Sequence, residues 1–335
     1  MNQPTAATTR NKPGAARQSN LELLRILSAL MIIACHFSTF GHFEDRIGFT
    51  ERNLFLAALS PILGYGGVCI FVLISGYFSV NSKFNWQRVA KIALETTFYA
   101  LTVYLVMTLS FHKQIDASQI VKTLLAVLNG YYWYPTVFIA LMIISPFLNK
   151  LLHSLSTKSF RRFLLVLFIT VCAIPTFLNV NYIYNDFVMM IFYYSAAAYV
   201  RLHPQEIFNK KLLWATVSVV SWIGAAFATV WRVTATKTEF SQYYTPNFGR
   251  RNGVLVFTLG MGLFLFFRSL KLPGSGSSRI INTLSSTTLG VYLAHTHPNV
   301  VRDWLFFEQF HSAEKKGWAL VITAAFATVT IFFVC

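Results

Sequence analysis

The sequence predicts an all-α protein, a polytopic bundle of transmembrane helices with about ten spans. Three observations lead to this fold class: the chain of 335 residues is 55% hydrophobic, only 12% of its residues are charged, and long apolar stretches recur from end to end. Soluble domains carry about twice that charged share. A helix of about 20 apolar residues matches the roughly 30 Å hydrocarbon core of a bilayer. The chain is therefore expected to lie in a membrane.

The predicted spans are the apolar stretches that polar or basic residues bound. They cover residues 21–41, 57–80, 89–110, 131–149, 163–179, 186–203, 212–231, 252–269, 282–301 and 317–335. The stretch 118–130 is too short to cross a bilayer and predicts an interfacial helix on the outer side. Residues 1–19 contain basic residues but no apolar core. They predict a disordered cytoplasmic tail rather than a signal peptide, which leaves 20–335 as the membrane domain.

The charge distribution predicts the orientation. With the N-terminus in the cytoplasm, 17 of the 28 Lys and Arg residues fall on the inner side. This positive-inside bias accounts for the net charge of +16 without a nucleic-acid partner, and it indicates a multi-pass membrane protein with a cytoplasmic N-terminus. All four cysteines lie in apolar stretches, with neither a disulfide framework nor metal-ligand spacing. The lipid bilayer is thus the first expected partner, and no metal is expected.

Two ionisable residues of the first span share one helix face. Arg25 and His36 are eleven positions apart, and eleven steps of about 100° bring the side chains back to within about 20° of each other. Arg25 is expected at the cytoplasmic rim and His36 beyond the midplane, some 16 Å away along the axis. A charge that faces lipid is costly, so this face should point into the protein. Arg25 as a headgroup anchor and His36 as a buried structural histidine remain the alternatives.

Four stretches, in order, resemble the acyltransferase 3 family of bacterial integral-membrane acyltransferases. Arg25 and His36 in "ELLRILSALMIIACH" fit the hallmark of that family, an Arg and a His separated by ten residues. The other stretches are "GGVCIFVLISGYFSV" (66–80), "LMIISPFLNKLL" (141–152) and "TLGVYLAHTHPNVVRDWLF" (288–306). The resemblance implies transfer of an acyl group, often acetyl, from cytoplasmic acyl-CoA to a hydroxyl of an extracytoplasmic glycan or lipid. His36 would be the catalytic base or a transient acyl carrier.

The predicted donor site lies at the cytoplasmic ends of the second and third spans. Arg88 and Lys91 are neighbours at i and i+3 and, with Arg25, would face the phosphates of acyl-CoA. The family has an arginine pair near this point, so Lys91 is a departure that exchanges a planar fork for a point charge. The alternative for both residues is positive-inside topology. Ser75 and Gly76 either make room for the thioester arm or serve close helix packing.

Other candidates are a carboxylate and a polar group near the outer surface. Glu95 lies one turn beyond Lys91 and is expected to need a partner, with Arg25 as the predicted one. Its two predicted roles are a structural ion pair and the orientation of catalytic His36. His295, Asn299 and Arg302 follow one face of the ninth span and predict an acceptor-binding site, against simple interfacial anchoring.

Two other kinds of function are open from the sequence. One is a glycan or lipid transporter, and the other is an accessory protein of envelope-polymer biosynthesis; neither performs acyl transfer. Prolines interrupt the apolar segments irregularly, whereas an inverted-repeat transporter is expected to break its helices at matched positions of two halves. The shared face of Arg25 and His36 favours the enzyme.

Overall fold

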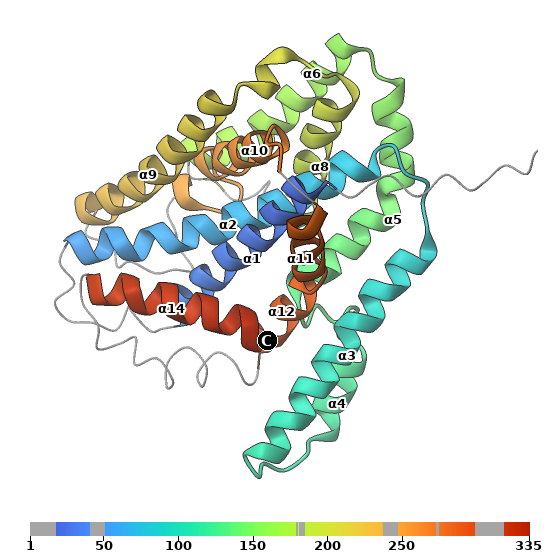
Figure 1. Ribbon diagram of the computed structural model, residues 1–335, viewed down its shortest axis with the longest axis vertical. Coiled ribbons are helices and arrows are strands. Elements are labelled where there is room, and N and C mark those ends of the chain that lie inside the picture. The colour runs from blue at the N-terminus through green and yellow to red at the C-terminus, as the bar shows by residue number, and fades with distance from the viewer. Residues whose placement is uncertain are drawn as a thin grey trace, which may run out of the picture.

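The computed structural model describes residues 18–40, 51–178, 180, 185–236, 247–272, 275–298 and 318–335. These residues form helices and connecting turns, with no strand among them (Figure 1). The α-helices are α1 (Ser19–Phe40), α2 (Glu51–Ser79), α3 (Trp86–Ser110), α4 (Ala117–Leu124), α5 (Trp133–Ser154), α6 (Thr157–Leu167), α7 (Ile174–Leu178), α8 (Asp186–Leu202), α9 (Lys211–Thr236), α10 (Val254–Arg268), α11 (Ser275–Ser286), α12 (Thr288–His295) and α14 (Trp318–Val334). A π-helix, η2 (Phe168–Ala173), joins α6 to α7, and two 3₁₀ turns are η3 (Glu206–Asn209) and η5 (Asn247–Gly249). The all-α prediction is confirmed.

Six segments of the described chain are long and apolar enough to cross a membrane, so the predicted count of about ten is not confirmed. They are Ser19–Phe37, Ala58–Ser79, Trp86–Ser110, Trp133–Ser154, Thr157–Leu178 and Lys211–Arg232. Helix α10 has only 15 residues, and α8 and α14 have 17 each. At 1.5 Å per residue these cover about 22–26 Å, short of a hydrocarbon core of about 30 Å.

The predicted ninth span is not one continuous helix. The structure ends α11 at Ser286 and begins α12 at Thr288, so the helical run breaks inside the segment predicted as 282–301. The residues at this break all carry hydroxyl side chains: Ser285, Ser286, Thr287 and Thr288. The short helix expected over 118–130 is present as α4, which packs against α3, and together they extend from the body at the lower end of Figure 1.

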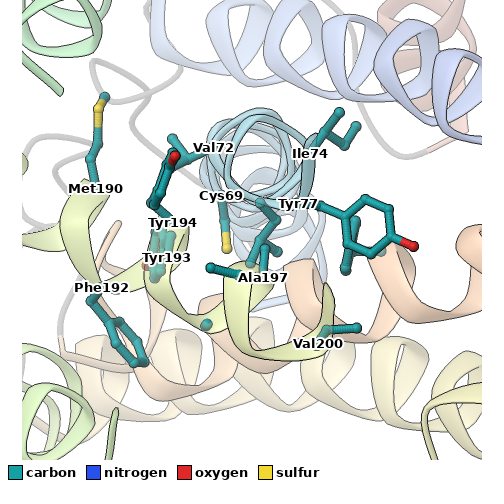
Figure 2. Close-up of a cluster of buried hydrophobic side chains, with 14 of the residues drawn as sticks. Cys69, Val72, Ile74, Tyr77, Met190, Phe192, Tyr193, Tyr194, Ala197 and Val200 are labelled. Atoms are coloured by element: carbon teal, nitrogen blue, oxygen red, sulfur yellow. The ribbon is translucent and has the colours of Figure 1, made fainter. Parts of the chain in front are cut away.

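The core is built around α2 and α8. Helix α2 packs against α1, α8, α9 and α10, and its side chains Cys69, Val72 and Tyr77 meet the buried face of α8 (Figure 2). Ala197 and Val200 of α8 lie in the same cluster, which is closed to solvent. Small residues allow this close approach, which is how helices associate where lipid offers no hydrophobic driving force.

Side-chain hydrogen bonds join the start of α10 to the π-helix η2 and to α7. The π-helix ends two residues before Pro175, which has no N–H to donate to the preceding turn. The side-chain amide of Asn252 donates to the Val171 carbonyl of η2 at 2.8 Å, and Thr176 Oγ1 of α7 accepts from the Val254 N–H at 3.1 Å. These bonds fix the start of α10 against the irregular helix.

Candidate active site

A cavity of about 480 Å³ lies among α1, α2, α3, α5, α11 and α12. This volume is typical of a small-molecule site, and the wall combines apolar side chains with a few charged, hydroxyl and aromatic groups, as such sites do. Six of the ten predicted site residues line it: Arg25, Ser75, Arg88, Lys91, Glu95 and His295. Residues that the sequence separates by up to 270 positions are therefore brought to one place.

Helix α1 presents the face that its periodicity predicts. Arg25, Ala29 and Ile32 line the cavity, spaced at i, i+4 and i+7. His36 continues the same row one turn further on but is not itself part of the cavity wall. It contacts His295, and His295 does line the cavity. The row therefore leads from Arg25, at one end, to a pair of histidines at the other.

Arg25 pairs with a different carboxylate from the one predicted. Its guanidinium lies 3.2 Å from the carboxylate of Glu22, one turn earlier on α1, and no ion pair joins it to Glu95 among the described residues. Ser285 of α11 donates a hydrogen bond to the same carboxylate oxygen, Oε2 of the buried Glu22. The pairing with Glu95 is thus corrected: a local i,i+3 partner is available without bringing α3 to α1. Glu95 instead faces the cavity, half-buried.

The basic side of the cavity is formed by the first turns of α3. Arg88 and Lys91 are both exposed and both line the cavity. Arg88 also lines an adjoining chamber of about 50 Å³, together with Lys83 and Asn85. Asn85 caps α3, since its side chain accepts from the Gln87 N–H at 2.8 Å. Two lysines and an arginine thus gather at the start of one helix, where anions are favoured.

Ser75 and Gly76 point to different sides of α2. Ser75 lines the cavity, with its hydroxyl bonded to the Phe71 carbonyl at 2.8 Å. A Cβ on Gly76 would lie 2.4 Å from the carbonyl oxygen of Tyr194 in α8, and Gly76 is not part of the cavity wall. Of the two roles predicted for Gly76, close helix packing is therefore the one that its surroundings fit. Its position serves the close packing of α2 on α8.

The two histidines form one hydrogen-bonded pair. His36 Nδ1 lies 2.9 Å from His295 Nε2, and the ring centroids are 5.1 Å apart. His295 is 1% exposed, and its Nδ1 is 2.5 Å from the Val291 carbonyl of its own helix. The sequence assigned His295 to acceptor binding and His36 to catalysis. The structure places both in one contact, although 259 positions separate them.

Two tyrosines in the wall were not singled out from the sequence. The rings of Tyr134 and Tyr292 lie 5.8 Å apart, and Tyr134 stacks on Phe138 at 5.6 Å. Tyr292 also lies 6.5 Å from the His36 ring. The chain has 15 tyrosines, and nothing in their local sequence distinguishes these two. The only signal in the sequence is that Tyr292 lies three positions before His295, a predicted site residue.

The remaining predicted residues lie beyond what the structure describes. Asn299 and Arg302, predicted to bind the acceptor, are outside the described residues. Residues 1–17 of the predicted tail 1–19 are outside them as well. Within the described ranges, no three side chains of the His, Cys, Asp and Glu types converge to hold a metal ion. Of the predicted acceptor site, the structure therefore describes only His295.

Comparison with known proteins gives the family. The model of the acyltransferase 3 family, described as an acyltransferase domain, matches residues 18–335. No curated protein and no solved structure matches the chain. The matched range contains every described helix and the whole cavity. A match over nearly the full length, on a chain of apolar helices, leads to one conclusion: the protein belongs to the acyltransferase 3 family and is a membrane acyltransferase.

Proposed function

We propose that the protein is an O-acyltransferase that moves an acyl group, most simply acetyl, from cytoplasmic acyl-CoA to a hydroxyl of an extracytoplasmic glycan or lipid. One observation carries the proposal: a single cavity extends from exposed cations on α3 to the buried His295, which contacts His36. A donor with phosphates at one end and a reactive thioester at the other matches these two ends of the cavity.

The cations fit the nucleotide end of the donor. Arg88, Lys91 and Lys83 supply positive charge around the cavity and its adjoining chamber, and the structure pairs none of the three with a carboxylate among the described residues. Arg88 can form the forked hydrogen bonds that suit phosphate oxygens, whereas a lysine offers a point charge. The apolar middle of the wall, with Phe71 and Phe138, suits the uncharged arm that carries the thioester.

The histidine end fits proton transfer. In the proposed reaction, His36 takes the proton of the acceptor hydroxyl while the hydroxyl oxygen attacks the thioester carbonyl. The tetrahedral intermediate then collapses, the carbon–sulfur bond breaks, and the departing thiolate receives the proton from the imidazolium. An alternative with the same balance passes the acyl group briefly through the His36 ring. In both, an imidazole that is neutral before the reaction is required.

The topology supports a transfer across the membrane. With the positive-inside orientation, the start of α3 faces the cytoplasm, where acyl-CoA is made available. His36 lies eleven residues beyond Arg25, or about 16 Å deeper along α1. The acyl group would therefore have to be carried about half of the way through the hydrocarbon core before it meets the acceptor.

Labelling in oriented membranes tests the proposal. Inverted vesicles, which expose the cytoplasmic face, are given acetyl-CoA that is radiolabelled in the acetyl group. We expect alkali-labile label in the glycan or lipid fraction of vesicles that contain the protein, and none in vesicles without it. Label that resists alkali, or uptake of intact acceptor without any label, would contradict the proposed reaction. A second experiment tests the orientation. A cysteine placed between α9 and α10 should react with an impermeant reagent in intact cells; reaction only after lysis would reverse the orientation.

A further inference from the structure

The hydrogen bonds around His295 have a fixed direction. A carbonyl oxygen can only accept, so the proton of His295 lies on Nδ1, where it is donated to Val291 at 2.5 Å. His295 is 1% exposed, and a charged ring is costly there. A neutral His295 then has an unprotonated Nε2, which accepts. The hydrogen of the 2.9 Å contact is therefore donated by His36 Nδ1.

This direction assigns the tautomer of His36. If Nδ1 of the neutral His36 ring carries the hydrogen, the nitrogen able to take a proton is Nε2. The opposite tautomer would turn the basic nitrogen toward His295 and leave the hydrogen on the side where an acceptor hydroxyl must be deprotonated. Once His36 is protonated, its contact with His295 becomes a charge-assisted hydrogen bond, which is stronger than the neutral one.

Helix α12 holds His295 firmly. The hydroxyl of Tyr132 donates to the Leu293 carbonyl at 2.9 Å, which ties α12 to the start of α5. A Cβ on Gly290 would come within 2.4 Å of the Tyr99 hydroxyl, so α12 packs tightly on α3 as well. His297, two residues after His295, contacts the Ala100 carbonyl of α3 at 3.0 Å. Contacts on two sides of α12 thus restrict the place from which His295 meets His36.

From these contacts we propose that His295 is a positioning residue, which holds the ring of His36 in the tautomer whose Nε2 is the base. The inference deepens the proposed function and rests on it, and it replaces the sequence-based assignment of His295 to acceptor binding. His295 does not touch the reacting atoms in this scheme. It acts through His36: the Val291 carbonyl fixes the proton on His295, and His295 in turn fixes the proton on His36.

Two variants of equal size test the role of the accepting nitrogen. His295→Gln offers an amide oxygen near the position of Nε2, whereas His295→Met fills the same space without a strong acceptor. We expect His295→Met to lower kcat roughly 10- to 100-fold, the usual cost of losing a partner that orients a functional histidine, with KM for acetyl-CoA unchanged. His295→Gln should recover most of that rate. All rates are normalised to the amount of protein in the membrane.

His203→Met is the matched control, because it also removes a hydrogen-bonded imidazole, here one that contacts Thr157 Oγ1 at 3.1 Å, but at the end of α8 and outside the cavity wall. It should leave the normalised kcat within about twofold of the wild type, far less than the roughly 10-fold or larger loss expected for His295→Met. Equal losses in His295→Met and His203→Met would show a merely structural role and overturn the inference. So would a His295→Gln variant as slow as His295→Met, or a change confined to KM for the acceptor. Activity in His36→Asn would instead overturn the proposed function itself.

Discussion

The two ends of the cavity are built in opposite ways. At the histidine end, His295 is buried, and every nitrogen of its ring has a partner at a short distance. At the cationic end, Arg88 and Lys91 are exposed and lie on the first turns of a helix that extends from the body (Figure 1). The first arrangement fixes individual atoms, and the second supplies charge over a broad area.

The difference indicates which substitutions each end will tolerate. A buried hydrogen-bonded pair depends on atom positions, because each partner left without its bond costs the full desolvation of a polar group. Exposed charges act through a field that water and salt screen, so one of several cations can be lost at small cost. Substitutions at the two ends should therefore differ in magnitude and in the kinetic constant that they change.

The largest effect is expected at His36. His36→Asn keeps similar size and hydrogen bonding but cannot take a proton at neutral pH. Because a general base contributes roughly 10²–10⁴-fold, acyl transfer should fall below detection while the variant inserts normally. The measurement is the ester-linked acyl content of surface glycan in a deletion strain, with membrane abundance in parallel. Restored acylation would show that His36 is a structural histidine. The histidine end of the cavity would then have no chemical role to set against the cationic end.

An intermediate effect is expected where packing, not chemistry, is disturbed. Gly76→Ala places a Cβ 2.4 Å from the Tyr194 carbonyl and 2.8 Å from its Cα, both backbone atoms. The helices must separate, and overpacking of this kind costs about 1–3 kcal/mol of stability. Thermal unfolding in detergent measures it, with the neighbouring Ser75→Ala as control, since that side chain faces the cavity. An unchanged unfolding temperature in Gly76→Ala would show that α2 and α8 are less tightly packed than described.

The smallest effect is expected at the cationic end. Arg88→Ala should raise KM for acetyl-CoA by up to roughly fivefold, the equivalent of an exposed charge contact worth about 1 kcal/mol, and should leave kcat intact. The wild-type KM should also rise with salt, and the variant should respond less. Lys158→Ala removes an exposed cation of α6 that does not line the cavity, and serves as control. Unchanged donor dependence in both Arg25→Ala and Arg88→Ala would remove these residues from the site.

The sequence predicts best what depends on neighbours along one helix. The row of Arg25, Ala29 and Ile32 on the cavity face follows directly from the helical period, as does the place of His36 beyond it. The pairing of Arg88 and Lys91 along the wall is local in the same sense. Such arrangements need no knowledge of the tertiary fold.

What the sequence leaves open depends on contacts between distant segments. His36 meets His295 only because α12 starts anew at Thr288 and is tied to α3 and α5. Hydropathy alone predicted one straight span there, since a break between Ser286 and Thr288 leaves the apolar pattern intact. The same limitation led to Glu95 as the predicted partner of Arg25, because a buried charge signals the need for a partner but not its identity.

The bond from Asn252 to the Val171 carbonyl has a consequence for how the chain can change over generations. Asn252 is 2% exposed, and its side-chain amide donates to the Val171 carbonyl at 2.8 Å. A buried amide needs an acceptor at this place, and an apolar residue at position 252 would take this donor away from the carbonyl. A change at position 252 is therefore harmful unless the π-helical turn around position 171 changes with it, so these two positions, 81 residues apart in the sequence, are expected to evolve together.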